Sequence, residues 1–206
     1  MLLKFTSQDL FNTALVDVAT TQPVFHLSTN VLTAGPSSGK LCRETEISDA
    51  AGRVVATIEW MGRVPQKITL FDECVGGLVD LFASNTVQII PKQISIATRF
   101  DTEYFWTATP DSVYLLDYDS NTRMAQLHIR APALKATHAP ISGRGSTYLE
   151  LSPHPQNLAS QVEILVSLLM MDILRRGRFD LPAYSFGPPS RLQQAWARLR
   201  PRRNTI

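Results

Sequence analysis

The sequence predicts a mostly β protein in which one closed antiparallel barrel of about 10 to 12 strands encloses a hydrophobic helix near the C-terminus. Three observations support this fold class. Short alternating segments recur about every ten residues as far as position 151, with turn residues between them. The segment 156–176 has the features of a helix, and its part 164–174 is apolar on nearly every side. The chain of 206 residues is long enough for one well-buried core and short for two.

The clearest predicted strand is 52–61. Its apolar side chains Val54, Ala56, Ile58 and Trp60 fall on one face and the polar Arg53, Thr57 and Glu59 on the other, which is the period of a strand with one buried face. Turn residues precede it at positions 49–52. We expect strands, in chain order, at 2–6, 13–18, 24–28, 40–48, 52–61, 67–71, 86–90, 104–107, 113–116, 123–130 and 146–151.

The predicted helix, residues 156–176, is the most apolar segment of the chain. Between Ile164 and Leu174 only Ser167 and Asp172 are polar, so a helix here must be buried on most sides. A membrane span is the alternative, but it needs about 20 consecutive apolar residues and tolerates an internal carboxylate poorly. We therefore favour a core helix and expect no transmembrane segment.

The end of this helix is also predictable. Arg175 and Arg176 lie in its last turn, where the helix dipole favours cations, and Gly177 is a natural left-handed terminator. Asp172 is a carboxylate on a buried helix, so it requires an arginine or solvent as a partner.

Basic charge is concentrated after the helix. From Arg175 onward there are eight arginines and one acidic residue, Asp180, although the net charge of the whole chain is only +2. We therefore divide the chain into a barrel, 1–178, and a basic tail, 179–206. Nucleic-acid binding is not expected, because it usually needs a basic face across the folded domain. The arginines that we assign to an anionic partner are Arg191, Arg198, Arg200, Arg202 and Arg203.

A solvated basic tail is the simplest interpretation of this segment. The alternative is a docking element, because Leu192, Trp196 and Leu199 have the spacing of an amphipathic helix. Homo-oligomerisation through 181–206 is one expectation from this pattern.

No motif indicates a metal or a cofactor. The segment 35–40 differs from a phosphate-binding loop because three residues, not four, separate its glycines and Leu41 follows the lysine. The N-terminal apolar stretch is interrupted by Lys4 and Gln8, so no signal peptide is expected and we predict a cytoplasmic protein. The histidines, none of which has metal-ligand spacing, are His26, His128, His138 and His154.

Two groups of residues are candidates for a site. The carboxylates Glu44, Glu46 and Glu59 lie on strands expected to pair across the turn at 49–52, which places carboxylates on one face for acid and base chemistry. Surface ion pairs with nearby arginines explain the same residues. The second group is expected to line a pocket at the barrel mouth and consists of Trp60, Tyr104, Trp106, Tyr118, Arg43 and Arg63.

Several segments resemble a fungal family with a domain of unknown function, the DUF6593 type, related to tubby C-terminal-like and LURP-one-related barrels. They are FTSQDLFNT at 5–13, GRVVATIEW at 52–60, YFW at 104–106 with VYLLD at 113–117, and the helix with its arginine end. The resemblance covers about residues 2–178 and implies an antiparallel barrel around the C-terminal helix. Related barrels include phosphoinositide-binding tubby domains and phospholipid scramblase-like proteins, but their lipid-binding positions have no residue-by-residue match here.

The sequence thus favours a binding module for a lipid headgroup, a small molecule or a protein, with an anionic lipid or a small apolar molecule as the expected partner. The alternative is a cofactor-independent enzyme of small-molecule metabolism that uses the three glutamates beside the barrel-mouth pocket.

Overall fold

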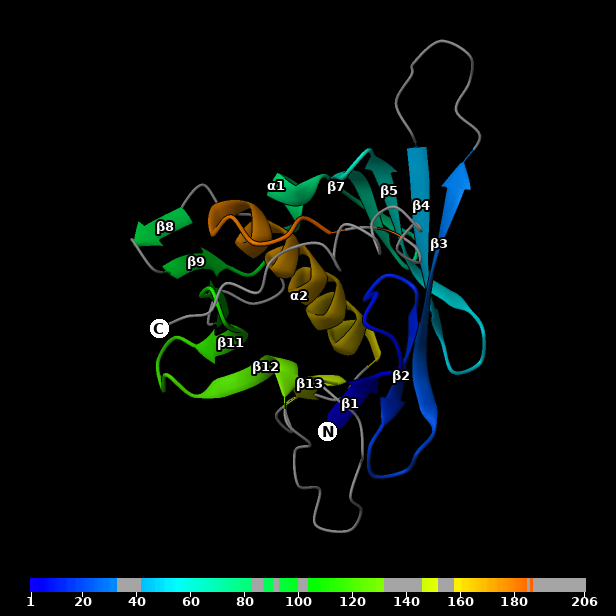
Figure 1. Cartoon of the computed structure of the whole chain (residues 1–206), viewed down its shortest axis with the longest axis horizontal. Helices are drawn as coiled ribbons and strands as arrows, with labels where there is room; N and C mark the ends of the chain where they lie inside the picture. Colours follow the sequence, from blue (N-terminus) through cyan, green and yellow to red (C-terminus); the bar gives the residue numbers. More distant parts are fainter. Residues whose placement is uncertain are drawn as a thin grey trace, which may run out of the picture.

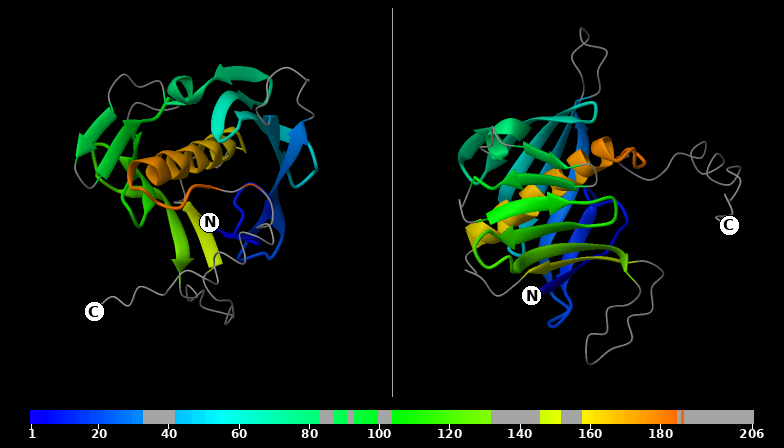
Figure 2. Two further views of the ribbon diagram at one scale, coloured as in Figure 1. Left: turned by 45° about the horizontal axis from the view of Figure 1, so that its top comes forward. Right: turned by 90° about the vertical axis from the view of Figure 1, so that its left-hand side faces the viewer.

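A computed structural model describes residues 1–32, 42–82, 87–90, 93–99, 104–131, 146–151, 158–184 and 186. One antiparallel sheet curls round a central helix, α2 (Figure 1 and Figure 2). The strands are β1 (Leu2–Phe5), β2 (Thr13–Asp17), β3 (Pro23–Leu32), β4 (Cys42–Asp49), β5 (Val54–Met61), β6 (Val64–Leu70), β7 (Glu73–Gly76), β8 (Val87–Ile90), β9 (Gln93–Ala97), β10 (Tyr104–Ala108), β11 (Val113–Asp117), β12 (Arg123–Ala131) and β13 (Ser146–Leu151). The helices are α1 (Leu78–Leu81) and α2 (Leu158–Arg178).

The sheet is a meander whose first and last strands meet in its middle. In the described part of the chain, thirteen strands follow the order β7-β6-β5-β4-β3-β2-β1-β13-β12-β11-β10-β9-β8. The mostly β architecture with a C-terminal helix is confirmed, with more strands than the 10 to 12 expected. The strands not expected from the sequence are β7 and β9, of which β7 has only four residues.

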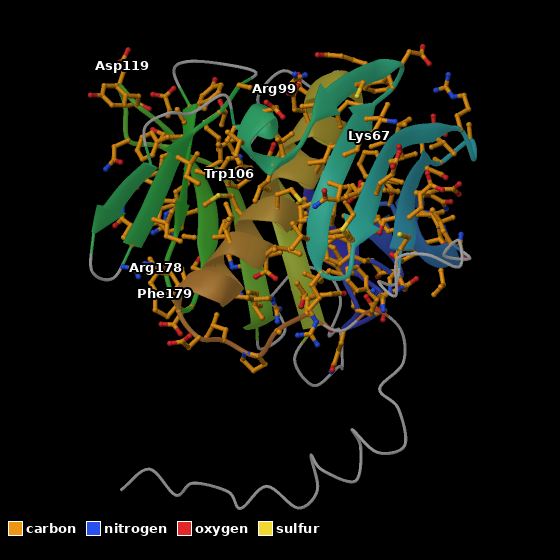
Figure 3. All side chains as sticks on the ribbon, turned by 90° about the horizontal axis from the view of Figure 1, so that it is seen from above. Lys67, Arg99, Trp106, Asp119, Arg178 and Phe179 are labelled. Atoms are coloured by element: carbon orange, nitrogen blue, oxygen red, sulfur yellow. The ribbon has the colours of Figure 1, made fainter. Side chains whose placement is uncertain are left out.

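The two edge strands of this sheet are β7 and β8, and α1 lies between them in the chain. Over the described residues, no strand pairing joins β7 to β8. Side chains connect this region instead, because the Arg99 guanidinium, just after β9, binds Glu73 at 3.0 Å and Glu163 of α2 at 2.7 Å. Arg99 is labelled beside α2 in Figure 3.

The alternation predicted for β5 is correct except at its start. Ile58 and Trp60 face the core, but Val54 is half-exposed and Val55 is buried in its place. The cause is a β-bulge, since the register between β4 and β5 shifts after Ile47. The turn before β5 forms as expected, with Gly52 at a φ of +79°.

Helix α2 is the centre of the core. The side chains of Val162, Leu165, Val166 and the run from Leu168 to Met171 have at most 1% of their surface exposed. This confirms that an all-round apolar segment becomes a helix buried on every side. None of the helices in the described part of the chain is long and apolar enough to cross a membrane.

The polar end of α2 is held by ion pairs. Asp172 is 2% exposed, and its two carboxylate oxygens accept hydrogen bonds from Arg175 Nε at 3.0 Å and Arg176 Nε at 2.6 Å. Arg175, itself buried, also donates to the Pro110 carbonyl at 2.9 Å. Asp172 therefore has two arginine partners, Arg175 and Arg176, where an arginine or solvent was predicted.

The helix does not terminate at Gly177, contrary to the prediction. Gly177 lies inside α2, and the left-handed residue is Asp180, with a φ of 49°. The Leu181 N–H donates to the Arg176 carbonyl at 3.1 Å, the six-residue bond of a Schellman cap. The last turn continues past the glycine because Phe179 still reaches the core before the chain reverses.

Packing continues beyond the boundary expected at residue 178. Phe179, Tyr184 and Phe186 all pack against the main core cluster. The first part of the predicted tail is therefore part of the folded unit, while 187–206 lie outside the described residues.

Candidate functional site

A cavity of about 380 Å³ lies where α2 ends and the chain folds back over the core. Four of its lining residues, Arg63, Gly177, Asp180 and Ala183, are exposed, so the cavity opens to solvent. Its walls come from α2, the β5–β6 turn and the segment after the helix. The lining residues are Arg63, Ile173, Arg176, Gly177, Asp180, Leu181, Ala183, Tyr184 and Phe186.

A cluster of four aromatic rings, Phe11, Trp60, Tyr184 and Phe186, lies beside this cavity and forms its floor. The Phe186 ring lies 4.9 Å from Trp60, 5.5 Å from Phe11 and 5.3 Å from Tyr184, measured between ring centroids. Trp60 is buried and donates from Nε1 to the Thr45 hydroxyl at 2.8 Å, which fixes its ring. The floor is therefore apolar and assembled from three parts of the chain.

Tyr184 anchors this cluster through its hydroxyl. The O–H donates to the Asp9 carboxylate, and the same oxygen accepts the Phe11 N–H at 3.1 Å. Burial raises the pKa of Tyr184, and the hydrogen bond to Asp9 raises it further. The phenol thus stays neutral at physiological pH and acts as a structural donor.

Two arginines, Arg63 and Arg176, line the cavity, and a third, Arg43, lies over the ring of the lining residue Phe186. The Arg43 guanidinium lies 5.0 Å from the Phe186 ring centroid and donates to the Gly62 carbonyl at 2.9 Å. Arg176 is held by Asp172 and donates to the Pro182 carbonyl at 3.0 Å. Arg63 is exposed and has no ion-pair partner among the described residues. Arg63 is therefore the cation best placed to meet a ligand.

The cavity lining also includes one carboxylate. Asp180 lines the cavity, and the last carbonyls of α2 contribute the negative end of the helix dipole. An acidic group of a ligand is attracted to Arg63 and repelled by Asp180.

The carboxylates predicted as catalytic candidates are brought together, but on the outer face of the sheet, away from the core. Glu44 and Glu59 are direct register partners on β4 and β5, as the expected antiparallel pairing requires. They alternate with the core-facing Thr45, Ile58 and Trp60, so they point outward, as does Glu46. Glu59 pairs with Lys67 at 3.1 Å, and Lys67 is labelled on the outer side of its strand in Figure 3.

The predicted aromatic residues do not share one pocket. Trp60 belongs to the cavity floor, whereas Trp106 is fully buried and Tyr104 is 7% exposed, both on β10. The Trp106 Nε1 atom is buried and has no hydrogen-bond partner among the residues that the structure describes. Tyr118 is 74% exposed and its ring lies 6.1 Å from Phe105. The predicted arginines Arg43 and Arg63 do lie together at the cavity, one against Phe186 and one in its wall.

Sequence reasoning missed Asp9, Phe11, Tyr184 and Phe186. The signal for the last two was present, because Tyr184 and Phe186 are two aromatic residues within a segment otherwise interpreted as a basic tail. The segment 35–40 and His138, His154, Arg191, Arg198, Arg200, Arg202 and Arg203 lie outside the described residues. Within the described residues no cluster of metal-ligating side chains occurs.

The fold and the cavity together define an antiparallel β protein built round a buried C-terminal helix, with a small solvent-open cavity at the helix end. The chain belongs to the family of unknown function DUF6593, which matches residues 8–177. No curated protein and no solved structure matches it.

Proposed function

We propose that this protein is a binding module that holds a small amphipathic ligand in the cavity at the end of α2, with the ligand's acidic group on Arg63. The observation that carries the proposal is an exposed arginine without an ion-pair partner in the described part of the chain, set in a largely apolar cavity. A volume of about 380 Å³ is in the range of small-molecule sites. Ile173, Leu181 and Phe186 would contact the apolar part of the ligand.

We further propose that the sheet is a tubby-like closed barrel. Support comes from the single antiparallel sheet that curls round a central apolar helix (Figure 2) and from the resemblance in sequence. Closure would require the edges β7 and β8 to meet beside α1, where Arg99 already links Glu73 to Glu163.

The enzyme alternative has less support. Glu44, Glu46 and Glu59 lie on the outer face of the sheet, and Glu59 is already paired with Lys67. General acid–base catalysis needs its carboxylates within reach of one bound substrate, and these point away from the core-facing side on which the cavity floor lies.

Calorimetric titration of the full chain with octanoate and octyl phosphate tests the binding proposal, with octanol as the neutral control. We expect Arg63→Gln to weaken binding of both anions about tenfold, because a charge-assisted hydrogen bond is lost, and to leave octanol unchanged. Arg123→Gln on β12 is the matched control and should behave as the natural protein does. Equal loss for octanol, or no binding of either anion, contradicts the proposal.

A lipid headgroup and a free small molecule could both supply the acidic group, and vesicles separate them. Co-sedimentation with neutral and with anionic vesicles, repeated with Arg63→Gln, identifies a lipid if pelleting needs both the anionic lipid and the arginine. Native mass spectrometry of the purified chain identifies a soluble ligand that has co-purified.

A further inference from the structure

An apolar row crosses four strands on the outer face of the sheet. Leu32, Cys42, Met61 and Val64 are successive register partners on β3, β4, β5 and β6. Leu32 and Met61 are each 41% exposed and Val64 is 57% exposed. Because direct partners in an antiparallel sheet point to the same side, these side chains form one strip across the sheet.

The neighbouring row on the same face is acidic. Glu44 and Glu59 are register partners on β4 and β5, and Glu46 follows two residues further along β4. Lys67 is their basic neighbour on β6, and it is already bound to Glu59 at 3.1 Å. A partner that matches this face therefore has an apolar stripe with cations along one side.

The described chain ends at the same rim. Phe186 packs on Trp60 and lies under Arg43, and these are the residues next to Met61 and Cys42 on the inner face. Residues 187–206 continue from this point. The spacer Gly187-Pro188-Pro189 spans about 10 Å when it is extended at about 3.1 Å per residue, comparable to the thickness of one sheet layer.

The sequence after this spacer has the complementary pattern. Ser190 and Gln193 form a capping-box pair, which predicts that a helix starts here, and Pro201 predicts that it ends by residue 199. In such a helix Leu192, Trp196 and Leu199 share one face. Arg191 and Arg198 are seven residues apart, so they lie along one flank of that face.

The dimensions agree as well. From Leu192 to Leu199 a helix rises about 10 Å, and four adjacent strands span about 14 Å. A short isolated helix is marginal in water, so it needs a surface to form on. The three-residue spacer keeps it at a high effective concentration near its own chain's outer face.

We propose that residues 190–199 form a helix that docks in cis across the apolar row of β3 to β6, with Arg191 and Arg198 along the acidic row. The described surface supplies the strip and the carboxylates, and the tail supplies the apolar stripe and the arginines. This interaction is independent of the ligand proposed above.

Cysteine crosslinking in the full chain tests the docking. In a Cys42→Ala, Cys74→Ser background, Met61→Cys is combined with Ala195→Cys, which lies beside the apolar stripe, or with Gln194→Cys, which lies on the opposite side of the helix. We expect the disulfide between Met61→Cys and Ala195→Cys to form within one chain about tenfold faster than the disulfide with Gln194→Cys, because only position 195 faces the strip. Val64→Cys in place of Met61→Cys repeats the measurement if the first pair folds poorly.

Charge reversal supplies a second measurement. Glu44→Lys should slow closure of the Ala195→Cys pair severalfold, since it repels the arginine flank. Equal closure rates for positions 194 and 195 overturn the docking. Crosslinks that form only between two chains overturn docking in cis and assign the strip to a second copy.

Discussion

Arg99 Nε lies 2.7 Å from the Glu163 carboxylate, which ties the segment after β9 to the central helix. The same guanidinium binds Glu73 at the edge of the sheet, with contacts at 3.0 and 3.1 Å to its two carboxylate oxygens. Arg99 is therefore one of the links across the region where the described residues show no pairing between the two edge strands.

Replacing Arg99 should destabilise the fold. Arg99→Ala leaves Glu163, with 16% of its side chain exposed, without this partner, and we expect a loss of about 1 to 2 kcal/mol. Urea unfolding followed by circular dichroism measures it. Lys67→Ala is the control, because both side chains of the Lys67–Glu59 pair are nearly half exposed and its loss should cost under about 1 kcal/mol. Equal effects of the two variants would contradict the linking role of Arg99.

Asp172 should be among the most sensitive positions of α2. Asp172→Ala leaves Arg175 buried without its carboxylate, and removing one partner of a buried pair costs about 3 to 5 kcal/mol. The midpoint of urea unfolding should fall sharply. Ser167→Ala, a buried residue of the same helix, is the matched control, and a comparable loss there would mean that the ion pairs are not the cause.

Two substitutions test where α2 ends: one removes a glycine inside the helix, and the other introduces a glycine at the left-handed residue after it. Gly177→Ala should stabilise the protein by about 0.5 to 1 kcal/mol, because Gly177 is inside α2 and nothing lies within 4 Å of an added Cβ. Asp180→Gly should also stabilise it, by about 1 kcal/mol, since Asp180 has a φ of 49° at the negative end of the helix. Thermal unfolding measures both changes in stability. Destabilisation by Gly177→Ala would mean that Gly177, and not Asp180, terminates the helix.

Stability should fall at acidic pH through Asp49 and Glu73. Burial works to raise the pKa of Asp49, but hydrogen bonds from Arg53 and from the backbone outweigh it, so the pKa is lowered. Hydrogen bonds from Arg99 lower the pKa of Glu73. A lowered folded pKa means that the stabilisation is complete above the unfolded pKa, near 4, and is lost as pH falls through the folded value.

Melting temperatures measured from pH 6 down to about pH 2 test this linkage. We expect Asp49→Asn and Glu73→Gln each to reduce the slope on the acid side. Asp119→Asn, at an exposed turn labelled in Figure 3, should leave the slope unchanged. A slope that is the same in all three variants would assign the acid sensitivity to other groups.

The structural elements that were predicted correctly are those that leave a local pattern in the sequence. The alternation of Ile58 and Trp60 reports a half-buried strand, and the apolar run from Leu165 to Met171 reports a helix buried on all sides. The candidate site was harder to predict from the sequence. Arg43 and Arg63 were grouped with the expected pocket residues, but Phe186, which contacts Arg43 and lines the same cavity as Arg63, lies more than a hundred residues later in the chain.

The sequence by itself determined the mostly β architecture, the position of the central helix and the need of Asp172 for a partner, because periodicity and burial are local properties of the chain. Only the tertiary structure decided that Glu44 and Glu59 face outward, that Trp106 is enclosed, and that Tyr184 and Phe186 return to Asp9 and Trp60. Those outcomes depend on strand register and on contacts between distant segments. A single residue of register or a bulge such as the one at Val54 moves a side chain from one face of the sheet to the other.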